Sequence, residues 1–281
     1  MKSSKIVGIL LPLCWIAFEM QGNTVPASLP DAEARLNNLF SAISPEKSDS
    51  EKLQLTNIIL CTLDSILQLP GSFDYPFDQL KTLGKVTSSN RKIRIFTWNL
   101  PLKDGTNKYF GFVLHKTDNG KAINIYRLTD RSATLDDPAM TSLTPDNWYG
   151  CLIYAIVETK VSVDTYYTLL GYDPENLFIT RKLVDMLWLN DKNEPVFGKA
   201  LFYYNKSMHC RILFEYAAKV QMSLKWNDKL NMIVFDHLSP IKPSYTGNYQ
   251  YYGPDFSYDG LKFEKGVWEC IEDIDVRNSK E

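Results

Sequence analysis

The fold class is decided by the stretch Lys92-Ile93-Arg94-Ile95-Phe96-Thr97-Trp98-Asn99-Leu100, which is rich in β-branched and aromatic residues. Such residues favour strands because their side chains pack well on a pleated surface. A turn sequence, Lys103-Asp104-Gly105-Thr106-Asn107, follows this stretch, and Tyr109–His115 then alternates with Phe110 on its apolar face. Because Asp-Gly tolerates positive φ, the three segments together predict a β-hairpin.

The same pattern of short apolar runs and turns continues toward the C-terminus. Thr117-Asp118-Asn119-Gly120 is expected to turn the chain into Ile123–Leu128, so that the first three strands form a meander. Thr180–Leu189 suits a helix or a strand, and we favour the strand because its neighbours are strands. A hairpin around Lys265-Gly266 is expected to end the fold. Further strands are expected at Trp148–Val161, Thr165–Leu170, Arg211–Tyr216 and Leu230–Phe235.

The clearest alternation of apolar and polar residues in the chain lies between residues 219 and 226. Its apolar members are Val220, Met222, Leu224 and Trp226. A strand with one buried and one solvated face has this pattern. The alternation therefore predicts a strand here, with Trp226 buried.

Helices are expected before the strands. Asp31–Ile43 suits a short helix, and Ser48 with Glu51 forms a capping-box pattern that opens a longer helix to about Leu69. Apolar residues fall along one side of that helix, as packing on a sheet requires. Residues 70–90 then read as a connector. The predicted fold is α+β, with N-terminal helices packed on a mainly antiparallel β-sheet, in a sandwich or open barrel. Residues 23–90 form the helical segment and connector, and residues 91–281 form the antiparallel β domain.

The chain begins with a signal-peptide pattern, predicted to cover residues 1–22. Lys2 and Lys5 precede an apolar run from Ile6 to Phe18. That run is shorter than the roughly 20 residues that span a bilayer. Cleavage after Gly22 or Ala27 would suit a signal peptidase, while an uncleaved anchor and a lipid anchor at Cys14 are the alternatives. We expect an exported protein of the periplasm or cell surface, with no transmembrane span in the mature chain.

Composition narrows the classes of partner. The formal net charge is −2 and the basic residues are dispersed, which argues against a nucleic-acid partner. Four cysteines lie beyond the leader, and export would permit disulfides among them, although buried thiols are an equal alternative. These cysteines are Cys61, Cys151, Cys210 and Cys270.

Catalytic and metal-binding motifs are sparse. The three histidines show neither HxH nor HxxxH spacing, so we predict no metal site and no cofactor. If the chain is a hydrolase, its acid and base must come from separate strands. Asp236, His237 and Asp255 are then the first residues to test.

An aromatic segment, Tyr245–Tyr258, is the main candidate for recognition. Tyrosines on a loop with Gly and Pro present flat faces with a polar tip, which suits contact with a glycan or a peptide. The alternative is that these rings cover a sheet edge or cap the core. The predicted binding residues are Tyr245, Tyr249, Tyr251, Tyr252, Asp255 and Tyr258.

Four runs carry a resemblance to a known group of proteins: residues 90–99, 166–171, 233–240 and 252–258. They resemble an uncharacterised exported family of Bacteroidota-type bacteria, over most of residues 90–278. The resemblance implies a Gram-negative periplasm or outer surface and no particular mechanism. The expected function is that of a non-enzymatic envelope protein that binds a glycan, a peptide or a partner, and the hydrolase is the alternative.

Overall fold

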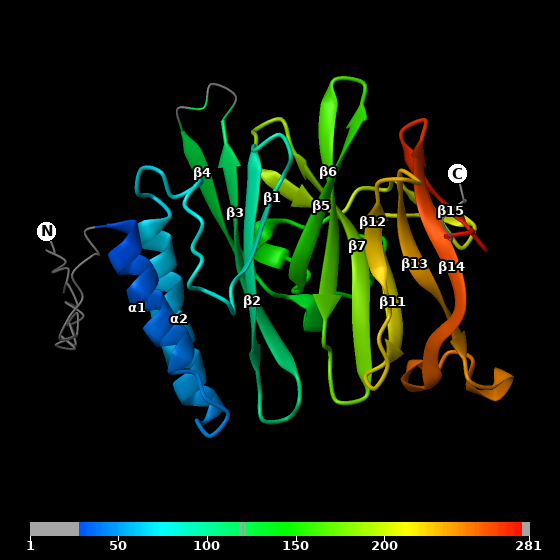
Figure 1. Cartoon of the computed structure of the whole chain (residues 1–281), viewed down its shortest axis with the longest axis horizontal. Coiled ribbons are helices and arrows are strands. Elements are labelled where there is room, and N and C mark those ends of the chain that lie inside the picture. Colours follow the sequence, from blue (N-terminus) through cyan, green and yellow to red (C-terminus); the bar gives the residue numbers. More distant parts are fainter. Residues whose placement is uncertain (1–27, 118–119, 121, 277–281) are drawn as a thin grey trace, which may run out of the picture.

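The structure, a computed structural model, describes residues 28–117, 120 and 122–276, and its elements are stacked in layers (Figure 1). Two helices are followed by three β-sheets, counted over the described residues. The α+β class and the mainly antiparallel pairing are as predicted. The predicted sandwich or open barrel is not what forms, because the strands make three stacked sheets. The predicted signal peptide lies outside the described residues.

The two helices begin where their capping residues predict. Helix α1 spans Leu29–Ser41 and α2 spans Asp49–Ile66. The side chain of Ser48 accepts a hydrogen bond from the backbone of Glu51, whose carboxylate accepts one from the backbone of Ser48, so the capping box is confirmed. In the described part of the chain, no helix is long and apolar enough to cross a membrane.

The first sheet confirms the predicted meander. It contains β1 (Gly84–Thr87), β2 (Ile93–Pro101), β3 (Asn107–Lys116) and β4 (Ile123–Thr129), paired antiparallel in that order. Strand β4 is therefore an edge strand. The turn between β2 and β3 has Gly105 at a φ of 85°, which is the positive φ that the Asp-Gly sequence predicted.

The second sheet lies in the middle of the stack. Its strand order is β11-β7-β6-β5, and β8 pairs with β7. The prediction of a strand at Thr180–Leu189 is confirmed. The predicted strand at Trp148–Val161 starts only at Leu152, because residues 145–147 form a 3₁₀ turn and Trp148 bridges to Asp130. The strands are β5 (Leu152–Val161), β6 (Asp164–Asp173), β7 (Ile179–Leu189), β8 (Pro195–Phe197) and β11 (Arg211–Ala217).

The third sheet forms the far layer, in the order β10-β9-β15-β14-β13-β12. Its pairing is antiparallel except between β15 and β9. Lys265 and Gly266 have φ values of 50° and 87° in the turn between β14 and β15, which confirms the predicted hairpin. The strands are β9 (Phe202–Tyr204), β10 (Ser207–His209), β12 (Leu224–Asn227), β13 (Met232–Pro240), β14 (Tyr252–Glu264) and β15 (Val267–Ile271).

An apolar core lies between each pair of neighbouring layers, which makes three cores among the described residues. The first combines Leu36 and Leu63 of the helices with Trp98 of β2. The second joins the first and second sheets, and the third joins the second and third sheets. A sheet that is covered on both faces has strands with consecutive buried residues, as in most of β2 and in the middle of β7.

The strand predicted at residues 219–226 is mostly wrong. Only Leu224–Asn227 is a strand, and Val220 is 38% exposed. Residues 218–223 carry the chain from β11 in the second sheet to β12 in the third, so they have no ladder partner. Trp226 is only half-buried, because β12 is the edge strand of the third sheet. Its Nε1 donates to Asp228 at 2.8 Å. The four cysteines named above are free thiols in this structure.

Candidate functional site

The aromatic segment leaves the third sheet between β13 and β14. Its rings pack in two pairs: Tyr245 and Tyr251 are stacked with centroids 4.2 Å apart, and Tyr249 and Tyr252 are tilted against each other with centroids 5.0 Å apart. The hydroxyl of Tyr252 accepts a hydrogen bond from the backbone of Gly247. The 3₁₀ turn η4 (Tyr249–Tyr251) packs beside β11, the edge strand of the second sheet. Much of this aromatic surface is therefore used within the molecule, although Tyr249 is 38% exposed.

Asp255 and Tyr258 lie apart from the paired tyrosines, in and after an irregular stretch of β14. Asp255 accepts hydrogen bonds from the backbone and hydroxyl of Ser257. Between them, Phe256 has a φ of 74° and is 94% exposed. Tyr258 sits opposite Asp236 in the ladder with β13. The six predicted binding residues thus occupy two neighbouring places rather than one surface.

The hydrolase candidates are divided in the structure. His237 Nδ1 donates to Asp259 Oδ2 at 2.7 Å, and the buried Asp259 also accepts from the backbone of Asp273. The hydrogen bond to Asp259 raises the pKa of His237 above its usual 6.5, and the charge of Asp255 adds to this effect. Asp236 instead accepts from the backbone of Ser223 at 2.7 Å. The partner of His237 is therefore Asp259, which sequence reasoning did not select for this role.

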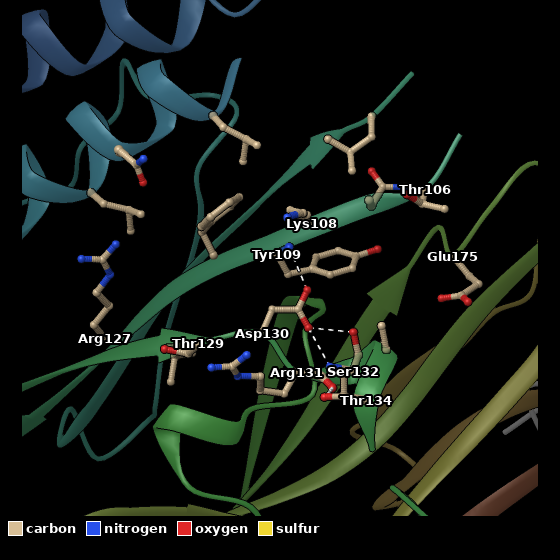
Figure 2. A pocket seen from close by; sticks show the side chains of 18 of the residues that line it. Thr106, Lys108, Tyr109, Arg127, Thr129, Asp130, Arg131, Ser132, Thr134 and Glu175 are labelled. Carbon is tan, nitrogen blue, oxygen red and sulfur yellow. Dashed lines mark hydrogen bonds between the residues drawn. The ribbon is translucent and has the colours of Figure 1, made fainter. Parts of the chain in front are cut away.

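A pocket that the sequence did not predict lies between α2 and the β3–β4 side of the first sheet (Figure 2). Its volume is about 730 Å³. We call it the α2 pocket. It is lined by Leu53, Asn57, Leu60, Leu102, Thr106–Phe110, Arg127–Thr134, Glu175 and Arg181. Leucines of α2 form an apolar wall, and the end of β4 with the following turn forms a polar wall.

Asp130 holds the polar wall in place. It accepts hydrogen bonds from the backbone of Tyr109 at 3.1 Å, and from the backbone and hydroxyl of Ser132 at 3.0 and 2.7 Å. A Cβ at Gly150 would lie 2.4 Å from Asp130 Cγ, so the glycine is required for this close approach. In Figure 2, Asp130 lies in the middle of the lining, with Arg127 and Arg131 on one side and Glu175 on the other.

The charges of the α2 pocket are unevenly paired. Arg181 contacts Glu175 at 2.6 Å, and Arg127 reaches Asp64 on α2 at 3.5 Å. Lys108 and Arg131 are exposed and form no ion pair within the part of the chain that the structure describes. The pocket therefore presents two cationic groups that no carboxylate neutralises.

A buried polar network supports the pocket from behind. The hydroxyl of Tyr109 donates to Asp173 at 2.5 Å, and that of Tyr149 donates to the same carboxylate at 3.3 Å. Asp173 is 1% exposed, and its burial raises the pKa to about 6, although both hydroxyl contacts act in the opposite direction. Arg181 lies 3.6 Å from Asp173 but is held more closely by Glu175 and by Glu215 at 2.8 Å.

The residues of this site come from separate parts of the chain, which explains why no sequence motif indicated the site. Thr106-Asn107-Lys108 and Thr129-Asp130-Arg131-Ser132 are short polar runs among them, and runs of this kind are ordinary in turns. Among the described residues, no group of three or more His, Cys, Asp or Glu side chains could hold a metal ion.

Comparison with known proteins does not assign this chain to a family. No protein family model, no curated protein sequence and no solved structure matches this chain.

Proposed function

We propose that this chain is an exported envelope protein that binds a small anionic ligand in the α2 pocket. The observation that carries the proposal is the presence of two unneutralised cations, Lys108 and Arg131, at a pocket of about 730 Å³. Ligand pockets in proteins commonly measure roughly 300 to 1,000 Å³ and combine apolar walls with a few polar groups that fix orientation. Export remains a proposal that rests on the charged and apolar start of the sequence.

The lining suggests the chemical class of the ligand. Arginine forms paired hydrogen bonds with carboxylates and phosphates, and lysine provides a compact positive charge. Thr129 adds a hydroxyl that can donate to an oxygen-rich group, whereas the hydroxyls of Ser132 and Thr134 already donate to Asp130 and to the backbone carbonyl of Arg131. Leu53 and Leu60 would cover an apolar or ring-shaped body. A carboxylate or phosphate joined to such a body fits both walls, and acidic sugars and fatty acids both belong to this class.

Binding can be measured by thermal shift and calorimetry with three probes: inorganic phosphate, glucuronate and octanoate. We expect at least one of these anions to raise the Tm, while uncharged glucose leaves it unchanged. The paired substitution Lys108→Ala with Arg131→Ala should weaken binding of that anion by about tenfold or more, because each charge-assisted hydrogen bond contributes about 1.5 to 3 kcal/mol. Octanoate and glucuronate distinguish an apolar body from a sugar ring.

The matched control is Lys160→Ala with Lys225→Ala, which removes two exposed lysines that do not line the pocket. This control should bind the anion as the wild type does. If the Lys108 and Arg131 variant binds as tightly as the control, the anion does not occupy the α2 pocket and the proposal is wrong.

A further inference from the structure

Exposed apolar side chains gather at one end of the stack, on turns that join different strands. Leu177 and Phe178, in the β6–β7 turn, are 69% and 66% exposed. Ile241, directly after β13, is 69% exposed, and Val220 and Tyr249 are each 38% exposed. Figure 1 shows the β6–β7 and β11–β12 turns and the β13–β14 connection at the same, lower end. We call these five residues the apolar rim.

Contacts between the turns make the rim continuous. The backbone of Ala218, next to the β11–β12 turn, donates to the carbonyl of Phe178 at 2.9 Å. Val220 lies against Gly253 at the start of β14. The backbone of Ile241 donates to the carbonyl of Tyr251 at 3.1 Å, which holds the end of β13 next to the start of β14. These contacts connect the turns of the rim from the second sheet to the third.

The charges along the rim are positive. Residues 217–222 and 241–251 contain Lys219 and Lys242 and no acidic residue. Both lysines are exposed and pair with no carboxylate in the described residues. Glu175, in the β6–β7 turn, contacts Arg181 at 2.6 Å, and Glu215 of β11 contacts the same guanidinium at 2.8 Å. Apolar tips therefore alternate with unpaired lysines, and tyrosines stand beside them.

We infer that the apolar rim docks this protein onto an anionic lipid bilayer. Side chains on the tips of separate turns can enter the headgroup region together, and lysines between them attract anionic lipids. Tyrosines favour this boundary because their rings are apolar and their hydroxyls remain hydrated. A protein partner is a weaker fit, since the rim is built from protruding tips rather than from a flat or grooved face.

The test is sedimentation of the full chain with lipid vesicles. One set contains phosphatidylcholine alone, and the other contains an equimolar mixture of phosphatidylcholine and phosphatidylglycerol. We expect the wild type to sediment with the anionic vesicles and to stay in solution with the neutral ones. Phe178→Ser with Ile241→Ser should lower the partition coefficient by about tenfold or more, since both changes remove exposed apolar area.

Two further variants separate lipid docking from a loss of folding. Lys219→Gln with Lys242→Gln leaves the apolar side chains in place and should lower partitioning by about an order of magnitude, a loss that added salt reproduces in the wild type. Val163→Ser is the matched control, because Val163 is 91% exposed in the β5–β6 turn at the opposite end. It should sediment like the wild type.

Three results would overturn the inference. The first is a wild type that remains in solution with anionic vesicles, and the second is a Val163→Ser variant that sediments as poorly as the rim variants do. The third is a wild type that elutes as a dimer from a sizing column while Phe178→Ser elutes as a monomer and vesicles recruit neither. The rim would then be a contact between two copies of this chain.

Discussion

Trp268 connects two layers through a single side chain. It is fully buried in β15, and its Nε1 donates to the hydroxyl of Thr168 in β6 at 3.0 Å. Its ring also packs edge-on against Trp226 and tilted against Phe263. A buried indole N–H needs a partner, and here the partner belongs to the neighbouring sheet. The third sheet is therefore positioned on the second by a specific bond in addition to apolar contact.

We predict that Trp268→Ala lowers the free energy of unfolding by about 3 to 5 kcal/mol, because it leaves a cavity and removes the hydrogen bond that the Thr168 hydroxyl accepts. Lys225→Ala, on the exposed side of β12, should change it by no more than about 0.5 kcal/mol. Urea denaturation of both variants measures the difference. Equal effects would mean that the third sheet is not fixed at Trp268.

Single residues were predictable from sequence where their role is local. Ser48 and Glu51 cap α2 because both partners lie within one turn of helix. Trp226 was not predictable in the same way. The alternation of apolar and polar residues that includes Leu224 and Trp226 indicates a strand but does not show where that strand begins. The burial of Trp226 depends on the crossing between sheets at residues 218–223, which no local pattern encodes.

Strands β3, β6 and β7 meet at Asp173. Tyr109 comes from β3, Asp173 from β6 and Arg181 from β7, so one buried carboxylate joins the first and second sheets. Folding raises the pKa of Asp173 from 3.8 to about 6, mainly through burial. A raised pKa means that the folded state binds the proton more tightly than the unfolded state does.

This shift predicts a definite pH dependence. The proton on Asp173 contributes stability in full below pH 3.8, and that contribution is lost as the pH rises through about 6. The loss should reach about 3 kcal/mol. Asp173→Asn should lack this dependence, whereas Glu269→Gln on the exposed side of β15 should keep it. Free energies of unfolding measured across that pH range provide the test, and a wild type that parallels Asp173→Asn throughout would contradict it.

The elements themselves were largely predictable, whereas the α2 pocket was not. Asp-Gly and Lys-Gly turns located the hairpins, because positive φ is a property of those few residues. The pocket depends on which face of α2 meets which end of β4. That choice is fixed by packing between elements far apart in sequence, so Lys108 and Arg131 carried no recognisable signal. The aromatic segment did carry a signal, but part of it came from tyrosines that pack against one another.

At the scale of the whole molecule, the second sheet has no free face. The first core borders the helices and the first sheet, while the second and third cores enclose the middle layer from both sides. The sequence of β7 gives no clear hint of this arrangement, because Arg181, Lys182 and Asp185 interrupt its apolar residues. Periodicity alone does not show how many layers follow.

We predict that the slowest amide hydrogen exchange occurs in the centres of β6 and β7. Their opening requires separation from both neighbouring sheets, so it should approach global unfolding in free energy. The edge strands β4, β10 and β12 should exchange faster. Hydrogen–deuterium exchange followed by mass spectrometry resolves these segments. Slower exchange in the third sheet than in the second would show that the middle layer is not the most stable unit.

The layers also follow one another in the order in which a ribosome makes them. The helices come first, then the first sheet, then most of the second sheet, and the third sheet is completed last. The exceptions are β9 and β10, which belong to the third sheet but precede β11 of the second sheet in the chain. Each layer can therefore form on the one before it as synthesis proceeds. Until residues 224–271 emerge, however, the apolar face of the second sheet has no cover. A growing chain would be most prone to aggregate during that interval, when a chaperone would be of greatest use.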